Sequence, residues 1–308
     1  MDVKNRSFQL IVAFSMIYFV WGSTYLAIAF AVETIPPFMA IGSRFAFAGS
    51  VLYGFLRLRG VAHPPKERLL NASMIGFFTL GLGTGLVAWA EQFISSGLAA
   101  LIITAVPFWL VFFDWLMLKG GRPNRYVTLG LVLGLCGIGL LVGPELSHGI
   151  ESSNGFAVLG VLFATISWSA GSLRSKMIVM PVNLFMSSAI QMAMGGASVL
   201  VIGLLIGEGS DVSLAAMSMK SMGGWLYLVI FGSFGAFSAY VWLLANAPPK
   251  QIASYAFVNP VVAVFLGWWL ADEKVTSSMI VAIFIVVLAV SFLVFFGGDK
   301  KKKKPVQN

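Results

Sequence analysis

Few side chains in this sequence could do acid or base chemistry inside its long apolar runs. Enzymatic proton transfer or metal catalysis would need paired carboxylates, or His and Asp residues, at one depth, and no apolar run contains such a set. The two histidines, His63 and His148, fall between apolar runs with no cysteine near either, so we expect no metal site. No glycine-rich phosphate loop is present, so we expect no nucleotide or other cofactor. The sequence therefore argues against an enzyme with catalytic residues.

Arg44 is the one charged residue well inside an apolar run. An ion within the bilayer costs at least ~2.5 to 3.5 kcal/mol on insertion scales, so we expect Arg44 to face other helices and to find a partner. The candidates are carbonyl groups at a helix C-terminus, the carboxylate of Glu91, or a carboxylate on a substrate. A structural clamp and a substrate contact are both open at this point.

One stretch, from Trp89 to Pro107, returns 153 residues later as the stretch from Trp242 to Pro260. In both copies a short polar break follows a long apolar run, and a second apolar run carries the proline near its middle. A proline removes one backbone donor and frees a carbonyl one turn earlier. In transporters built from two copies of one unit, such breaks lie at the repeat interface and bind substrate. A kink that serves packing alone is the alternative.

Two further tryptophans, Trp21 and Trp168, correspond with an offset of 147 residues, which also pairs Arg44 with Gln191. Both lie deep in apolar runs beside hydroxyl side chains, and an indole next to hydroxyl groups at that depth favours a ligand wall. Trp89 and Trp242 lie nearer the ends of their runs, where an interfacial anchor is the alternative. The predicted substrate-binding residues are Trp21, Ser23, Thr24, Arg44, Trp89, Pro107, Trp168, Gln191, Tyr240, Trp242, Tyr255, Asn259 and Pro260.

The composition is that of a membrane protein with many spans. Of the 308 residues, 58% are hydrophobic and 10% are charged, which leaves too little polar surface for a soluble protein. A helix needs about 20 apolar residues to cross the hydrocarbon core. The sequence predicts ten transmembrane helices, at residues 8–30, 38–58, 72–90, 97–118, 126–143, 155–174, 184–206, 223–244, 251–271 and 277–297.

The positions of the basic residues predict which side of the membrane each loop faces. If the N-terminus is cytoplasmic, the cytoplasmic segments hold all but three of the 20 Lys and Arg residues. Both termini are then cytoplasmic. Each copy has an odd number of helices, so the second copy enters the membrane from the opposite side. The predicted fold class is an all-α membrane protein of two inverted five-helix repeats, at residues 1–149 and 150–297, with a basic cytoplasmic tail at 298–308.

The formal net charge of +8 reflects this topology rather than nucleic acid binding, because the basic residues alternate with apolar runs instead of clustering on one solvated face. The run from Lys300 to Lys304 fits a tail attracted to anionic lipid. The single cysteine, Cys136, excludes an intrachain disulfide. We expect a small-molecule substrate and membrane lipid as partners, no nucleic acid, and either a monomer or a homodimer.

Three stretches resemble one known family. The WGSTYLAI run at 21–28, the PPFMAIGSRF run at 36–45 and the SYAFVNPVVAVFLGWWLADE run at 254–273 resemble the EamA family of the drug/metabolite transporter superfamily, and the resemblance extends over residues 8–297. It implies a ten-helix secondary transporter whose cavity is lined by helices 1, 3, 4, 6, 8 and 9, with export of amino acids or similar metabolites as the commonest activity. The first repeat departs from the second in one respect, because Gly120 stands where the symmetric partner of Glu273 would lie.

The predicted function is therefore that of a secondary transporter in the bacterial inner membrane. It would export small amphipathic metabolites, such as amino acids, by alternating access between two repeats. An uptake or exchange carrier is the first alternative, and an intramembrane enzyme is the second. If transport is coupled to protons, the coupling would have to use Glu91 or a group that the sequence does not identify.

Overall fold

The computed structural model describes residues 3–117, 124–147, 153–213, 215–247, 249–252 and 254–296. Across these ranges the chain forms helices joined by short connections and contains no β-strand. In chain order the elements are α1 (Val3–Ser15), η1 (Met16–Val20), α2 (Trp21–Val32), α3 (Pro37–Leu58), α4 (Lys66–Gly76), η2 (Phe77–Gly83), α5 (Thr84–Ala90), α6 (Ser96–Ile103), α7 (Val106–Met117), α8 (Arg125–Ser147), α9 (Ser153–Arg174), α10 (Leu184–Leu205), α11 (Glu208–Asp211), α12 (Met219–Tyr227), η3 (Leu228–Ala236), α13 (Phe237–Asn246), α14 (Pro249–Ile252), α15 (Tyr255–Ala271) and α16 (Ser277–Phe296).

Eight helices of the described chain are long and apolar enough to cross a membrane. They are Arg6–Val32, Pro37–Leu58, Lys66–Ala90, Ser96–Leu116, Arg125–Gly143, Asn154–Arg174, Leu184–Leu205 and Met219–Leu243. Two shorter apolar helices follow, Val258–Ala271 and Ser277–Phe292. The prediction of an all-helical membrane protein is thus confirmed, and all ten predicted spans have a helical counterpart. The third span begins at Lys66 rather than at residue 72, because its charged first turn precedes the apolar run on which the prediction relied.

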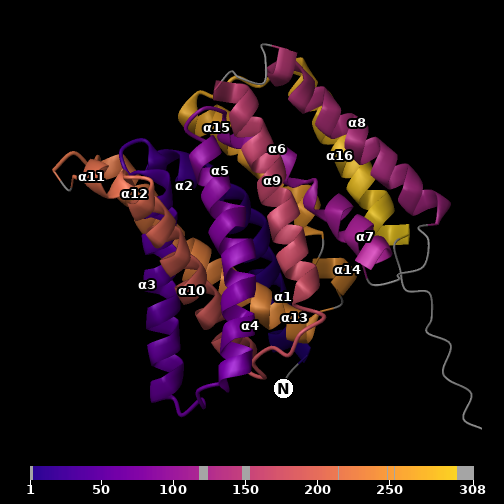
Figure 1. The fold of residues 1–308 in the computed structure, drawn as a ribbon. Helices are drawn as coiled ribbons and strands as arrows, with labels where there is room; N and C mark the ends of the chain where they lie inside the picture. Colours follow the sequence, from indigo (N-terminus) through magenta and orange to yellow (C-terminus); the bar gives the residue numbers. More distant parts are fainter. Residues whose placement is uncertain are drawn as a thin grey trace, which may run out of the picture.

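The packing of the helices repeats itself when the two halves of the chain are exchanged (Figure 1). In the first half, α2 packs against α12, η3 and α15 of the second half. In the second half, its counterpart α9 packs against η2, α5 and α7 of the first half. Counterpart spans also meet each other directly, with α3 against α10, α8 against α16, and α6 of the fourth span against α15 of the ninth. The structure therefore has the two-repeat design that the corresponding tryptophans and prolines predicted.

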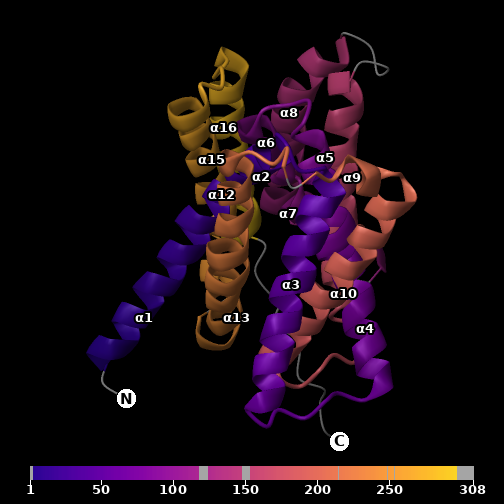
Figure 2. The ribbon, with the colours of Figure 1, turned by 90° about the vertical axis from the view of Figure 1, so that its left-hand side faces the viewer.

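Close approach of backbones holds α3 against α10, which lie side by side in Figure 2. A Cβ atom added at Gly49 would overlap the backbone of Ala193, and one added at Gly196 would overlap the backbone of Ala46. Lipid tails are as apolar as the side chains, so small residues that admit close packing stabilise such contacts in membranes. The two glycines permit an interface between the repeats that no larger residue fits.

Three spans contain a π-helical turn that the sequence did not predict. These turns are η1, η2 and η3. An offset of 153 residues carries residues 77–83 of η2 onto residues 230–236, which lie within η3, so these two are counterparts in the repeats. A π-helical turn widens the helix and leaves backbone groups without their usual partners, and such turns are frequent at functional sites.

Two spans are also interrupted, each near one of the two prolines that the repeat offset relates to each other. The fourth span divides into α6 and α7 at Thr104 and Ala105, and Pro107 is the second residue of α7. The ninth divides into α14 and α15 at Ser254, whereas Pro260 lies within α15. The two prolines therefore sit differently in their helices, although both spans are broken.

A pair of glycine substitutions within α3 tests the close contact with α10. Gly49→Ala should destabilise the protein by about 1 to 3 kcal/mol, because its methyl group overpacks the contact. Gly54 has no heavy atom within 4 Å of an added Cβ, so Gly54→Ala should be neutral or stabilise by up to ~1 kcal/mol through helix propensity. Thermal unfolding in detergent measures both, and equal midpoints for the two variants would contradict this account of the interface.

Candidate functional site

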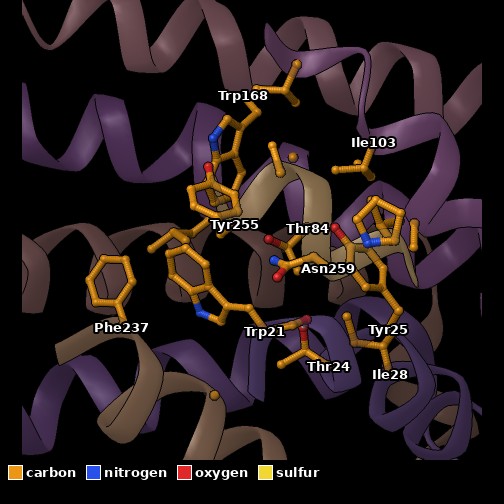
Figure 3. A pocket seen from close by; sticks show the side chains of 18 of the residues that line it. Trp21, Thr24, Tyr25, Ile28, Thr84, Ile103, Trp168, Phe237, Tyr255 and Asn259 are labelled. Carbon is orange, nitrogen blue, oxygen red and sulfur yellow. Dashed lines mark hydrogen bonds between the residues drawn. The ribbon is translucent and has the colours of Figure 1, made fainter. Parts of the chain in front are cut away.

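A cavity of about 170 Å³ lies between the two repeats. Its walls come from the first four spans and from the sixth, eighth and ninth spans. This includes all six helices implied by the family resemblance and adds α3, through Arg44 and Phe45. Figure 3 shows side chains from both repeats pointing into this space. Ligand cavities are commonly apolar with a few placed polar groups, and this one has that character.

Aromatic side chains form much of the wall. Trp21 and Trp168 both line the cavity, and the ring of Tyr255 lies between them in Figure 3. Tyr255 contacts Trp21 edge to face with ring centres 5.3 Å apart, and Tyr240 supports Trp21 at 5.0 Å from another side. Packed aromatic rings of this kind offer a rigid apolar surface with polar edges.

Arg44 reaches the cavity from α3 and is only 4% exposed. Its Nε donates a hydrogen bond to Oγ of Ser233 on η3, 3.0 Å away, and its guanidinium lies 4.5 Å from the centre of the Phe45 ring. No acidic side chain of the described chain lies within ion-pair distance of Arg44, so Glu91, one of the predicted partners, does not pair with it. The guanidinium is thus positioned by a neutral hydroxyl and keeps its charge available at the cavity wall.

Both repeat prolines line the cavity, and so do the residues whose carbonyls they free. Proline has no N–H for the carbonyl four residues earlier. That carbonyl belongs to Ile103 for Pro107 and to Ala256 for Pro260, and both residues line the cavity. The structure therefore places the two backbone irregularities of the repeats on one shared space.

The remaining polar side chains of the wall are partly engaged by the backbone. Oγ1 of Thr24 donates to the carbonyl of Trp21 over 2.6 Å. In the amide orientation that satisfies its surroundings, Nδ2 of Asn259 donates to the carbonyls of Ile17 and Tyr18, at 3.0 and 3.1 Å. These carbonyls belong to η1, so Asn259 compensates the π-helical turn and fixes α15 against the first span.

Eight of the predicted substrate-binding residues line the cavity: Trp21, Thr24, Arg44, Pro107, Trp168, Tyr255, Asn259 and Pro260. The structure does not place the other five on its wall. Ser23 bonds to the hydroxyl of Tyr227 at 2.7 Å, and Tyr240 lies behind Trp21. The side chain of Gln191 donates to Ser187 on its own helix.

Trp89 and Trp242, the last two of these five, pack against other helices. Trp89 lies over Gly160 of α9, where an added Cβ would clash with its ring, and contacts Phe93. Trp242 belongs to an apolar cluster with Leu243 and η1. Both tryptophans therefore fill space between helices, because the offset between the repeats fixes sequence correspondence but not the direction in which each side chain points.

Several wall residues were missed by the sequence analysis. Tyr25 lies one helical turn after Trp21 and thus shares its face of α2. Thr84 and Phe237 correspond to each other under the offset of 153 residues, and both line the cavity. Helical spacing and the repeat offset were signals that could have identified these three residues.

Two carboxylates lie at the end of the cavity where α5 ends. Glu91 directly follows α5 and is 7% exposed, and both of its carboxyl oxygens lack a hydrogen-bond partner in the structure. Glu273 follows α15 and accepts hydrogen bonds from N and Oγ of Ser96 and from N of Gly97, at 2.9, 2.7 and 3.1 Å. Burial raises the pKa of Glu91 well above its ordinary value, the nearby Glu273 raises it further, and the backbone at Ala29 partly offsets both effects.

The sequence matches the model of the EamA-like transporter family twice, over residues 9–143 and 155–295. The chain belongs to the EamA-like transporter family. Each match covers one of the two repeats seen in the packing. The assignment from the three sequence stretches is thereby confirmed, and the protein is a membrane transporter of this family.

Relatives of this EamA protein carry transporter names. The uncharacterized inner membrane transporter YedA of Escherichia coli K12 is 38% identical over 265 residues, which cover 85% of this chain and 82% of YedA. The uncharacterized transporter YoaV of Bacillus subtilis is 25% identical, over 83% of this chain and 87% of YoaV. A solved crystal structure that is 18% identical covers 93% of this chain and 96% of its own, with a TM-score of 0.62, and so has the same fold.

The burial of Glu91 predicts how stability varies with pH. Because its folded pKa is raised above the ordinary 4.5, the folded protein holds a proton that the unfolded chain releases. This stabilisation is complete below the unfolded pKa and is lost as pH rises toward the folded pKa, by about 1.4 kcal/mol for each pH unit in that window.

Glu91→Gln removes this loss, so its melting temperature in detergent should increasingly exceed that of the parent protein as pH rises from 5 to 8. The matched control is Glu67→Gln, since Glu67 is exposed at the start of α4. It should follow the parent at every pH. A constant difference between Glu91→Gln and the parent would show that the pKa of Glu91 is not raised.

Proposed function

We propose that this protein is a secondary transporter that exports small amphipathic metabolites with a carboxylate group, amino acids above all, by alternating access. The observation that carries the proposal is Arg44, a buried guanidinium on the cavity wall with a neutral hydroxyl as its side-chain partner. A buried cation is stabilised strongly by a carboxylate that bonds to it. The substrate would supply that carboxylate.

The rest of the wall fits the remainder of such a substrate. Trp21, Trp168 and Tyr255 offer apolar faces to a side chain, and the carbonyls freed by Pro107 and Pro260 are acceptors for an ammonium group. Among the described residues of the wall, Arg44 is the only basic one. A phosphate would call for several Arg or Lys residues, so the charge of the site suits one carboxylate.

The number and direction of the spans belong to the same proposal. α15 has 17 residues and α16 has 20, so at 1.5 Å per residue they are ~25 and ~30 Å long. These lengths approach the ~30 Å hydrocarbon core, and we count both as spans. The transporter then has ten spans in two inverted repeats, with both termini in the cytoplasm. Export is the direction that the family resemblance implies.

Transport by purified protein in liposomes tests the substrate. We expect uptake or counterflow of several labelled amino acids and none of their carboxamides, which lack the charge that Arg44 would bind. Arg44→Gln should lower the apparent affinity for amino acids by about 10- to 100-fold, the effect of one charged hydrogen bond of ~1.5 to 3 kcal/mol.

Arg57→Gln is the control for that loss, since Arg57 lies exposed near the end of the same helix, away from the cavity. It should transport as the parent does. Transport of an organic phosphate without any amino acid would contradict the substrate class. Net movement only from the outer to the cytoplasmic side would replace export by uptake while leaving the site intact.

Topology is tested by single cysteines in a Cys136→Ser background. Glu33→Cys and Asp272→Cys should react with a membrane-impermeant thiol reagent added to intact cells, because the charge distribution places these loops outside. Lys66→Cys should react only after the cells are broken. Labelling of Lys66→Cys in intact cells would overturn the orientation.

A further inference from the structure

Glu91 lies at the outer end of the cavity. Its backbone N–H donates to the carbonyl of Val87, one turn back on α5, and Val87 lines the cavity. Tyr25, another wall residue, lies near Glu91. The carboxyl group therefore sits just beyond the cavity, in the region where α2, α5 and α6 meet.

The surroundings of Glu91 contain nothing that would stabilise a negative charge fully. The facing titratable groups are Tyr25 of α2 and Glu273 after α15. Among the other elements packed against α5, η2 and α9 bring no ionisable group to it, and Arg44 of α3 is bonded to Ser233 instead. An ionised carboxylate without a partner in a dry site costs several kcal/mol, which protonation avoids.

The neighbouring carboxylate of Glu273 further favours a protonated Glu91. It accepts three hydrogen bonds from Ser96 and Gly97 at the start of α6, and accepting with both oxygens suits an ionised carboxylate. This clamp joins the ninth span to the fourth, so it holds the two repeats together on the outer side. Two neighbouring carboxylates are not readily ionised at once, so the clamp favours a neutral Glu91.

We propose that Glu91 is a proton-binding site, and that the outer end of the cavity closes only when this carboxyl group carries its proton. The proposal rests on the alternating access proposed above. Opening of the outer end would bring water to Glu91 and release the proton, whereas closure would take a proton up from the outer side. Low external pH would then favour the closed outer end, and high external pH would favour opening.

The sequence of the other repeat lacks the residues of this clamp, which explains why one side would respond to protons. Under the offset of 153 residues, Ser96 corresponds to Pro249, which has no backbone N–H, and Glu273 corresponds to Gly120, which has no carboxylate. The repeats therefore cannot form the same clamp at the cytoplasmic side. The proton site and the clamp together belong to the outer side alone.

Thiol labelling in intact cells tests the proposal without any substrate. Ala100 lines the cavity one turn inside the clamp and is 1% exposed, so an Ala100→Cys, Cys136→Ser protein reports opening to an impermeant methanethiosulfonate reagent. The labelling rate is measured from pH 6 to pH 8 in this protein and after adding Glu91→Gln. The rate of the protein that keeps Glu91 is divided by the rate of the Glu91→Gln protein. This ratio removes the intrinsic dependence of thiol reactivity on pH.

We expect this ratio to rise with pH by about tenfold or more, since one unit of pKa difference between open and closed states produces a tenfold change. Glu91→Met, which is also neutral, should behave as Glu91→Gln does and serves if that variant is not inserted. Glu33→Gln, at an exposed surface carboxylate paired with Lys220, should keep the pH dependence of the parent.

A ratio that stays constant from pH 6 to pH 8 would overturn the proton site while leaving alternating access and the substrate proposal untouched. A rise of the same size in the rate of the parent relative to that of Glu33→Gln would also overturn it, because the response would then come from general surface charge. No labelling in any of these proteins at any pH would overturn opening to the outside itself, and with it both proposals.

Discussion

Burying an ionisable group away from water costs more free energy than any other contact in this fold requires, and two such groups, Arg44 and Glu91, are buried beside one cavity. Arg44 is positioned by the hydroxyl of Ser233 and the face of a phenyl ring, so it keeps its charge. The carboxyl oxygens of Glu91 have no hydrogen-bond partner in the described chain, so protonation lowers the cost of burying this carboxyl group. The two solutions differ in kind. One leaves a fixed positive charge for a ligand, and the other makes the state of a side chain depend on protons.

The same constraint shapes the backbone around the cavity. Within a bilayer, irregular backbone is tolerated where it is covered by protein or lines a cavity. The irregular parts of these spans gather there: η2 and η3 contribute wall residues, and Pro107 and Pro260 free carbonyls of residues on the wall. At η1, the side chain of Asn259 donates hydrogen bonds to two backbone carbonyls and so partly compensates the irregular turn. Departures from the regular helix thus coincide with the space that a substrate would enter.

The two repeats share an architecture but not their end contacts. Gly49 and Gly196 bring α3 and α10 into a contact that the pseudo-symmetry maps onto itself. The hydrogen bonds of Glu273 to Ser96 and Gly97 have no counterpart in the sequence of the other side. The framework of the two repeats is therefore alike, whereas the residues that join the fourth and ninth spans through Glu273 belong to one end only.

The sequence alone determined the helical membrane class, the family and the two repeats, because apolar length and the recurrence of residues such as Pro107 and Pro260 are properties of the chain itself. It also singled out Arg44, since a charge within an apolar run is visible without a structure. Only the tertiary structure decided that Trp89 packs on α9 while Trp168 lines the cavity, that Arg44 bonds to Ser233, and that Glu91 is left without a partner. Those outcomes depend on how each helix is rotated and on where π-helical turns shift its faces, and both are set by contacts between residues far apart in the chain.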